Sequence, residues 1–355
     1  ATAAFLICRG RRMQGGQTGV GYGLKYQARC IADVKADTDQ TTFIAGTLSL
    51  KEENEVHLIR LSSSETELYC EASCPFDARI FSTVFSTSES YGATVWKIPE
   101  LYGQSSSPQL ESLASLDDHT CKIKCVLWWP SGQHDKLISI DEENLFLWSL
   151  DSSNKTAKLI LKVQSRESVG SLHYFSGGAW DPHDRNAVSA TCDTSIQFWD
   201  LRTMTKTNSI EHAHVRSLDY NKKRQNILVT AEEEAGIRVW DLRMTNSPVR
   251  DFPGHAHWTW AVQFNPEYEE LILSAGTDSA VNLWFASSLS SDDTSSESLV
   301  ESPTRLVDPL LNSYNDYEDS VYGLAWSSRQ PWIFASLSYD GRVVVESVKP
   351  YLSRK

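Results

Sequence analysis

The chain has 355 residues, which leaves one large domain or two ordinary domains open. Hydrophobic residues make up 41% and aromatic residues 10%, enough for a packed core, so a mainly disordered chain is excluded. The formal net charge of −13 is a poor match to a phosphate backbone or an anionic membrane surface. No stretch approaches the roughly 18 to 20 apolar residues of a membrane-spanning helix, so we expect a soluble protein that does not bind nucleic acid.

The N-terminal residues 1–32 are rich in arginine and contain no acidic residue, as organelle transit peptides do. Met13 opens a glycine-rich stretch, and the twelve residues before it fit an upstream extension better. We therefore expect residues 1–19 to be a flexible N-terminal extension.

Seven cysteines, an odd number in a chain of this size, favour a reducing compartment over a disulfide framework. Two pairs have CxxxC spacing, Cys70 with Cys74 and Cys121 with Cys125, which raises the possibility of a metal site. On a strand this spacing places both thiols on one face, and half-buried thiols are the simpler interpretation. We expect no metal and no cofactor.

One short pattern recurs along the chain: alternating apolar residues, then tryptophan, often followed by Asp-Leu. The alternation has the period of a β-strand, and the tryptophans lie roughly 40 to 50 residues apart, the length of a four-stranded unit. Two degenerate copies, 55–61 with Ile59 and 341–347 with Glu346 at the tryptophan position, bring the number to seven. The five full copies are 92–98, 144–150, 195–201, 236–242 and 280–286, with Trp96, Trp148, Trp199, Trp240 and Trp284.

These segments resemble WD40 repeats, whose fold is a β-propeller of four-stranded blades around a central channel. The resemblance implies an all-β, seven-bladed WD40 β-propeller over residues 20–350, followed by a short tail, 351–355. Residues 286–304 are serine-rich and acidic without aromatic residues, which predicts a mobile loop between the sixth and seventh blades. Too few residues separate Leu61 from Phe81 for two strands, so we expect a shortened or irregular second blade.

In WD40 blades a histidine, a hydroxyl residue, an aspartate and the tryptophan form a buried hydrogen-bonded chain. The resemblance therefore implies structural roles for these residue types rather than a hydrolytic triad, and no GxSxG, HExxH, Walker or kinase motif is present. Glu142 and Glu234 replace the aspartate in two blades, and Tyr317 takes the histidine position of the last blade. The expected members of such chains are His255, Ser274, Asp278 and Trp284; His119 and Trp148; Asp193 and Trp199; and Trp240.

The last blade, 318–345, is more specific than a generic repeat. Together with 22–29, 46–59, 176–183 and 255–279, it resembles the WD-repeat proteins that interact with the EARP and GARP tethering complexes. Its sequence looks like that of a plant member of this family. The resemblance implies a non-enzymatic adaptor that binds tether subunits and supports endosomal recycling and retrograde vesicle traffic. It implies a cytoplasmic protein, peripheral to the trans-Golgi network and endosomes through its partners.

Aromatic residues outside the repeat positions are the candidate partner contacts, because Trp and Tyr are enriched at interface hot spots. They are Trp258, Trp260, Trp332 and Tyr339, and each could instead pack within its own blade. The sequence leaves the binding face, the oligomeric state and the strand that closes the ring open.

The main alternative is a substrate receptor of a cullin-RING ubiquitin ligase. Residues 199–202 and 240–243 both read WDLR and match the WDxR motif of such receptors, with Arg202 and Arg243 as the charged contacts. The same residues could simply cap the strand ends. A second alternative, a histone-tail binder, follows from the acidic composition.

Overall fold

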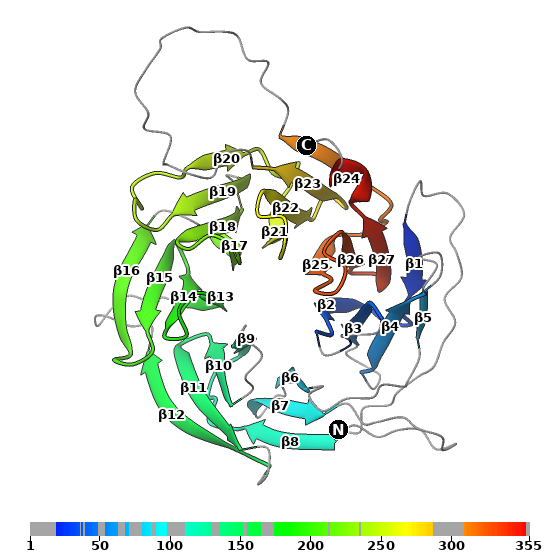
Figure 1. The fold of residues 1–355 in the computed structure, drawn as a ribbon. Coiled ribbons are helices and arrows are strands. Elements are labelled where there is room, and N and C mark those ends of the chain that lie inside the picture. Colours follow the sequence, from blue (N-terminus) through cyan, green and yellow to red (C-terminus); the bar gives the residue numbers. More distant parts are fainter. Residues whose placement is uncertain are drawn as a thin grey trace, which may run out of the picture.

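The computed structural model of the protein describes residues 19–35, 37, 40–48, 54–62, 68–70, 80–86, 90–97, 111–129, 135–151, 155–164, 174–211, 214–233, 236–286 and 309–352. Their strands form seven antiparallel sheets arranged as blades around a common axis (Figure 1). Six sheets have four strands and one has three. The prediction of an all-β, seven-bladed propeller is confirmed.

Within the first six blades, successive strands run from the axis outward in chain order, and the outermost strand of the seventh blade is β1 (Figure 1). The first blade holds β2 (Ala28–Asp33), β3 (Thr42–Thr47), β4 (Val56–Leu61) and β5 (Leu68–Cys70). The second holds β6 (Ile80–Ser86), β7 (Tyr91–Lys97) and β8 (Glu111–Leu116). The third holds β9 (Ile123–Trp128), β10 (Lys136–Asp141), β11 (Asn144–Asp151) and β12 (Thr156–Gln164).

The remaining blades repeat this order. The fourth holds β13 (Phe175–Trp180), β14 (Ala187–Cys192), β15 (Ser195–Asp200) and β16 (Thr205–Glu211), and the fifth holds β17 (Val215–Tyr220), β18 (Ile227–Glu232), β19 (Gly236–Asp241) and β20 (Arg250–Phe252). The sixth holds β21 (Thr259–Phe264), β22 (Leu271–Gly276), β23 (Val281–Phe285) and β24 (Leu310–Tyr314). The seventh holds β25 (Val321–Trp326), β26 (Ile333–Ser338), β27 (Arg342–Ser347) and β1 (Val20–Gly23).

All seven copies of the repeat pattern occupy equivalent strands: β4, β7, β11, β15, β19, β23 and β27. Both faces of these strands are covered by neighbouring blades, which explains their near-continuous apolar sequences. Trp284, for example, is 2% exposed and packs against Phe252 of the fifth blade, with 5.6 Å between the ring centroids. The core therefore lies between blades, and each blade needs its neighbours to bury its apolar faces.

The N-terminal strand β1 closes the ring. It pairs antiparallel with β27, and the backbone N–H of Leu24 donates to the carbonyl of Gly341 at 2.8 Å. Val20 and Tyr22 are buried there, in one core cluster with Ala335 and Val343 of the last blade. The outer strand of the last blade thus comes from the start of the chain, which identifies the closing strand that the sequence left open.

The second blade has three strands in the described part of the chain, so the prediction of a shortened blade is confirmed. Its strand nearest the axis is β6 (Figure 1). The indole of Trp128 in β9 donates to Ser82 Oγ of β6 at 3.1 Å, which attaches this blade to the third.

A short helix, α1 (Lys349–Leu352), follows the last blade, so the predicted tail at 351–355 begins inside a helical turn. The predicted N-terminal extension, apart from Gly19, and residues 287–304 of the predicted acidic loop lie outside the described residues. No helix in the described ranges has the length and apolar character needed to cross a membrane.

Candidate functional site

The inner strands share an irregularity at their second residue. In β21, Thr259 pairs with Gly276 and Ala261 with Ala275, so Trp260 is an extra residue opposite no partner. Such a β-bulge turns the strand and changes the direction of the extra side chain. Six inner strands have it, and the extra residues are Arg29, Lys124, Ser176, Arg216, Trp260 and Tyr322.

These six residues lie on one face of the ring, because the six inner strands that carry them run in the same direction along the axis. A repeated backbone hydrogen bond brings the first residue after the second strand to the same face. The N–H of Thr277 donates to the carbonyl of Trp258 at 3.0 Å, and that of Tyr339 donates to the carbonyl of Ser320 at 2.9 Å. Each of these six blades therefore presents a bulge residue beside a turn residue.

Four aromatic rings and two arginines make a continuous group on this face, which we call the axial cluster: Arg29, Arg216, Trp258, Trp260, Tyr322 and Tyr339. Trp260 and Tyr322 meet edge to face with 4.8 Å between their centroids, and Tyr322 and Tyr339 with 5.7 Å. The Arg29 guanidinium lies over both tyrosine rings, at 4.7 and 5.1 Å. The Arg216 guanidinium lies over Trp260 at 5.2 Å and over Trp258 at 5.6 Å.

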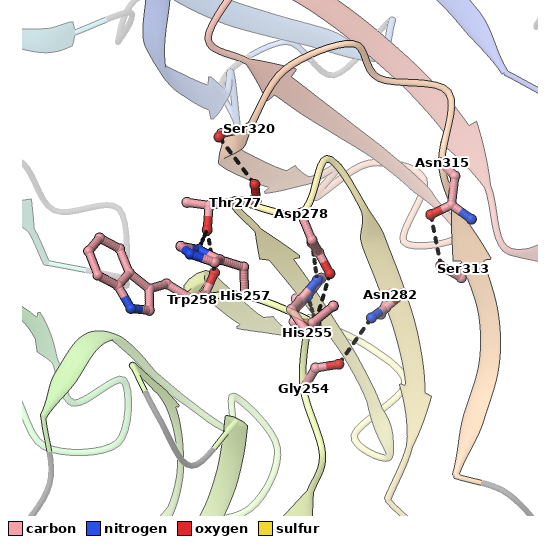
Figure 2. A network of polar contacts seen from close by, with 12 residues as sticks. Gly254, His255, His257, Trp258, Thr277, Asp278, Asn282, Ser313, Asn315 and Ser320 are labelled. Atoms are coloured by element: carbon pink, nitrogen blue, oxygen red, sulfur yellow. Dashed lines mark hydrogen bonds and ion pairs between the residues drawn. The ribbon is translucent and has the colours of Figure 1, made fainter.

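Trp258 is the most exposed ring of this cluster. It precedes β21, points away from the His255–Asp278 pair behind it (Figure 2), and is 43% exposed. His257 beside it bonds Thr277, with 2.5 Å between Nδ1 and Oγ1, which fixes the turn that carries the indole. An exposed indole held by a rigid turn is suited to packing against a partner.

Three of the bulge residues on this face are cations, and two of them form ion pairs with described residues. Lys124 Nζ lies 2.9 Å from Glu142 Oε1, and Arg216 forms an ion pair with Glu233. The turn residue beside Arg29 is Leu48, which is 42% exposed. Arg29 is exposed and has no ion pair with any residue that the structure describes.

The predicted hydrogen-bonded chain of the sixth blade is present and lies behind this surface (Figure 2). His255 Nδ1 lies 2.8 Å from Asp278 Oδ1, and His255 Nε2 lies 2.8 Å from Ser274 Oγ. The indole N–H of Trp284 donates to the same Ser274 oxygen at 2.8 Å. Burial lowers the pKa of His255 despite the nearby Asp278 carboxylate. With its hydroxyl held between two buried rings, Ser274 is placed for stability and not for nucleophilic attack.

The third blade has the same chain with a different aspartate. His119 lies 2.8 Å from Ser139 Oγ, which also accepts the Trp148 indole at 2.7 Å. The carboxylate that holds His119, at 3.0 Å, belongs to Asp141. The expectation that Glu142 replaces the aspartate is therefore wrong: the turn between β10 and β11 is shorter than the turn between β22 and β23, and Asp141, the last residue of β10, supplies the carboxylate.

The fourth blade corrects the expectation for Asp193 and Trp199. Asp193 accepts the backbone N–H of Tyr174 at 3.1 Å, and the Trp199 indole N–H is buried without a partner among the described residues. Ser189, at the position of Ser274, bonds the hydroxyl of Tyr220 in the next blade. The hydroxyl is used across blades here, so the described residues form no such chain around Trp199.

In two other blades, residues of other types take the places of the histidine or the aspartate. The Trp240 indole donates to Thr230 Oγ1 at 3.1 Å, and Thr230 in turn donates to Glu232 Oε1 at 3.1 Å. Glu234, which we expected in the aspartate role, lies outside the described residues. In the last blade the Tyr317 hydroxyl lies 2.5 Å from Ser336 Oγ, in the position predicted for the histidine.

The other candidate contacts lie on the opposite face. Trp332 is in the turn between β25 and β26, half-buried against two core clusters, with Lys349 over its ring at 4.9 Å. Arg202 and Arg243 follow β15 and β19, and each bonds the preceding aspartate: Arg202 Nη2 donates to Asp200 Oδ2, and Arg243 Nη2 to Asp241 Oδ2, both at 2.7 Å. The Arg202 side chain is still 69% exposed and borders a pocket of about 220 Å³. The structure thus brings Trp258, Trp260 and Tyr339 together and separates them from Trp332 and both arginines.

Of the cysteines that the structure describes with their side chains, Cys30, Cys121 and Cys125 are free thiols. No group of three metal-binding side chains occurs within the described ranges. Burial raises the pKa of Cys125 to about 12, so this thiol stays protonated and acts as a core residue.

The repeat pattern did not mark Arg29, Arg216 and Tyr322 as members of the cluster. Their common signal is their place as the second residue of each inner strand, which becomes visible when these strands are aligned by blade. The bulge that turns the side chains toward the axis has no simple sequence signature, because residues of several kinds occupy it here.

Fold and repeat pattern together define the class: the chain is a WD-repeat β-propeller. The model of the EIPR1 β-propeller matches residues 16–284, and that of the WD domain, G-beta repeat, matches residues 309–345. The chain therefore belongs to the EIPR1 β-propeller family. The WD repeat-containing protein DWA2 of Arabidopsis thaliana is 68% identical over 97% of this chain and 100% of its own length. EARP and GARP complex-interacting protein 1 of Homo sapiens is 34% identical over 92% of this chain and 95% of its own.

Proposed function

We propose that this protein is a non-enzymatic adaptor that binds the EARP and GARP tethering complexes and supports endosomal recycling and retrograde vesicle traffic. Membership of the EIPR1 family supports the interaction, since relatives in the family are named for binding these complexes. The propeller fold supports a scaffold role over an enzymatic one. Under this proposal the protein acts in the cytoplasm and reaches trans-Golgi and endosomal membranes through its partners.

The axial cluster is the observation that supports a binding surface. Trp258, Trp260 and Tyr339 lie together on one face with their rings partly exposed, and rigid aromatic anchors of this kind dominate many interfaces. We assign the tether contact to this face. Trp332 lies on the other face, so it would serve a separate contact.

The test is affinity purification of the tagged protein from its own cells, with mass spectrometry of the co-purified subunits. The proposal expects recovery of the subunits shared by EARP and GARP, and reduced recovery with Trp258→Ala combined with Tyr339→Ala. Arg202→Ala with Arg243→Ala is the matched control on the opposite face and should leave recovery unchanged. Absence of every tether subunit from the wild-type preparation would overturn the proposal.

A second candidate is a substrate receptor of a cullin-RING ligase. Two observations favour it: both WDLR arginines are exposed on one face of adjacent blades, and Arg202 borders a pocket. Here the same purification should recover a cullin adaptor. The double arginine variant should then lose the adaptor, and the aromatic double variant should keep it.

A further inference from the structure

We propose that the axial cluster binds an extended acidic segment of a protein partner, with a carboxylate of that segment on Arg29 and an apolar side chain on Trp258. This inference rests on the proposed function, because it names the chemistry by which the tether contact on this face would be made. It adds two residues, Arg29 and Tyr322, and a charge requirement to the surface described above.

The first argument comes from the three cations at equivalent bulge positions. Lys124 and Arg216 each have a glutamate from the turn of their own blade, Glu142 and Glu233. At the turn position beside Arg29 the chain has Leu48. Of these three cations, Arg29 alone has no ion-pair partner among the described residues. Another molecule can therefore supply that partner.

The second argument is the geometry of the guanidinium. Arg29 lies over the faces of both Tyr322 and Tyr339, at 4.7 and 5.1 Å. Cation–π contact with the rings does not use the guanidinium N–H groups, which can still donate in the plane of the group. A carboxylate accepts two such bonds side by side. The tyrosines also hold the long side chain, which lowers the entropy lost when a ligand binds.

The third argument is the continuity of the surface. Tyr322 contacts Trp260, and Arg216 joins Trp260 to Trp258, so the aromatic surface covers the seventh and sixth blades, with Arg29 of the first blade at one end and Arg216 of the fifth at the other. Such a strip fits an extended peptide that alternates charged and apolar contacts. A basic peptide would place its cations against Arg29 and Arg216, and the overall charge of −13 disfavours nucleic acid.

The preference of the axial cluster for one ligand charge depends mainly on the protein charges within about 8 Å, which is the Debye length at physiological ionic strength. The cluster can therefore bind carboxylates although the whole chain is acidic. Binding through Arg29 should weaken as salt is raised.

The first experiment compares capture of tether subunits by the wild type, Arg29→Glu and a control, Lys158→Glu. Lys158 is an exposed lysine on the outer strand β12 of the third blade, so the control carries the same charge change away from the cluster. We expect Arg29→Glu to lower capture about tenfold and to remove most of its salt dependence, with the control unchanged. Equal thermal melting of the three proteins establishes that folding is not the cause. Tether recovery that is insensitive to Arg29→Glu would overturn the inference and leave the proposed function standing.

The second experiment does not depend on the tether. A fluorescein-labelled peptide of alternating acidic and leucine residues is titrated with the full-length protein, and the same peptide with lysines in place of the acids is the control. We expect anisotropy to rise with the acidic peptide alone and the rise to be lost in Arg29→Glu. Arg29-dependent binding of this peptide without any tether recovery would reject the proposed function and keep the carboxylate site. No binding of the acidic peptide would reject the site.

Discussion

Val20 of β1 pairs with Val345 of β27, so the first and last strands of the propeller lie in the same sheet. The ring is closed by hydrogen bonds between the two ends of the chain and by the burial of Val20 and Tyr22. Val20 and Tyr22 share a core cluster with Phe43 and Ile59 of the first blade, so β1 also helps to pack the first blade against the seventh. Closure therefore links local strand pairing to the stability of the whole ring.

Truncation tests this closure. Removal of residues 1–18 should leave the melting temperature unchanged, because β1 remains. Removal of residues 1–23 takes away β1 and should cost about 3 kcal/mol or more, given the burial of Val20 and Tyr22. Urea unfolding of both truncated proteins gives the comparison, and equal stability of the two would show that β1 does not close the ring.

Ser274→Ala should destabilise the sixth blade. It removes the oxygen that accepts from Trp284 and bonds His255, and two buried polar groups lose their partner, at a cost of about 2 to 3 kcal/mol. Ser313→Ala in the same blade is the control, because its hydroxyl bonds Asn315 at the surface (Figure 2). The free energy of unfolding should change little there, and similar losses in the two variants would contradict the role of Ser274.

Two tryptophans at equivalent positions should respond differently to phenylalanine. Trp284 donates to Ser274 at 2.8 Å, and the Trp199 indole N–H has no partner among the described residues. Both substitutions reduce side-chain volume by the same amount, so their difference reports the hydrogen bond. We expect Trp284→Phe to cost about 1 kcal/mol more than Trp199→Phe in chemical denaturation. A larger loss at Trp199 would show that its indole is bonded after all.

Gly276→Ala should disturb the His255–Asp278 pair. A Cβ at this position would lie 2.5 Å from the His255 ring and 2.6 Å from Asp278 Oδ1, which is too close for ordinary contact. Relief of this clash requires the histidine to move, and we expect a loss of about 1 to 3 kcal/mol. Gly46→Ala, whose Cβ would have no atom within 4 Å, is the control for the loss of glycine in a strand. Equal melting temperatures for the two variants would argue against tight packing at Gly276.

Stability should fall as the pH drops below about 6.5, the ordinary histidine value. Burial lowers the pKa of His255 and of His57 in the folded protein. As the pH falls through the ordinary value, these histidines take up protons in the unfolded chain before they do so in the folded one. The stabilisation is therefore complete above that pH and is lost toward the lower, folded pKa values. Melting temperatures between about pH 7.5 and pH 5 test this, and His255→Gln should flatten part of the slope.

The sequence by itself determined the propeller. A single repeat with strand periodicity cannot bury its apolar faces alone. The pattern at Trp148 or Trp284 therefore specifies a stack of β-sheets, whatever the lengths of the loops. The spacing of His255, Ser274 and Asp278 also determined one hydrogen-bonded chain, because all the members of that chain belong to one blade. The shortage of residues between Leu61 and Phe81 likewise predicted a blade with fewer strands.

Only the tertiary structure decided which residues meet across blades. The bulges at Arg29, Trp260 and Tyr322 depend on strand register, and the short turn between β10 and β11 makes Asp141 the partner of His119. Tyr220 reaches Ser189 from the next blade, which local spacing does not reveal. Contacts within a blade follow from separation along the chain, whereas the axial cluster and the pairing of Val20 with Val345 join residues that come together only when the ring closes.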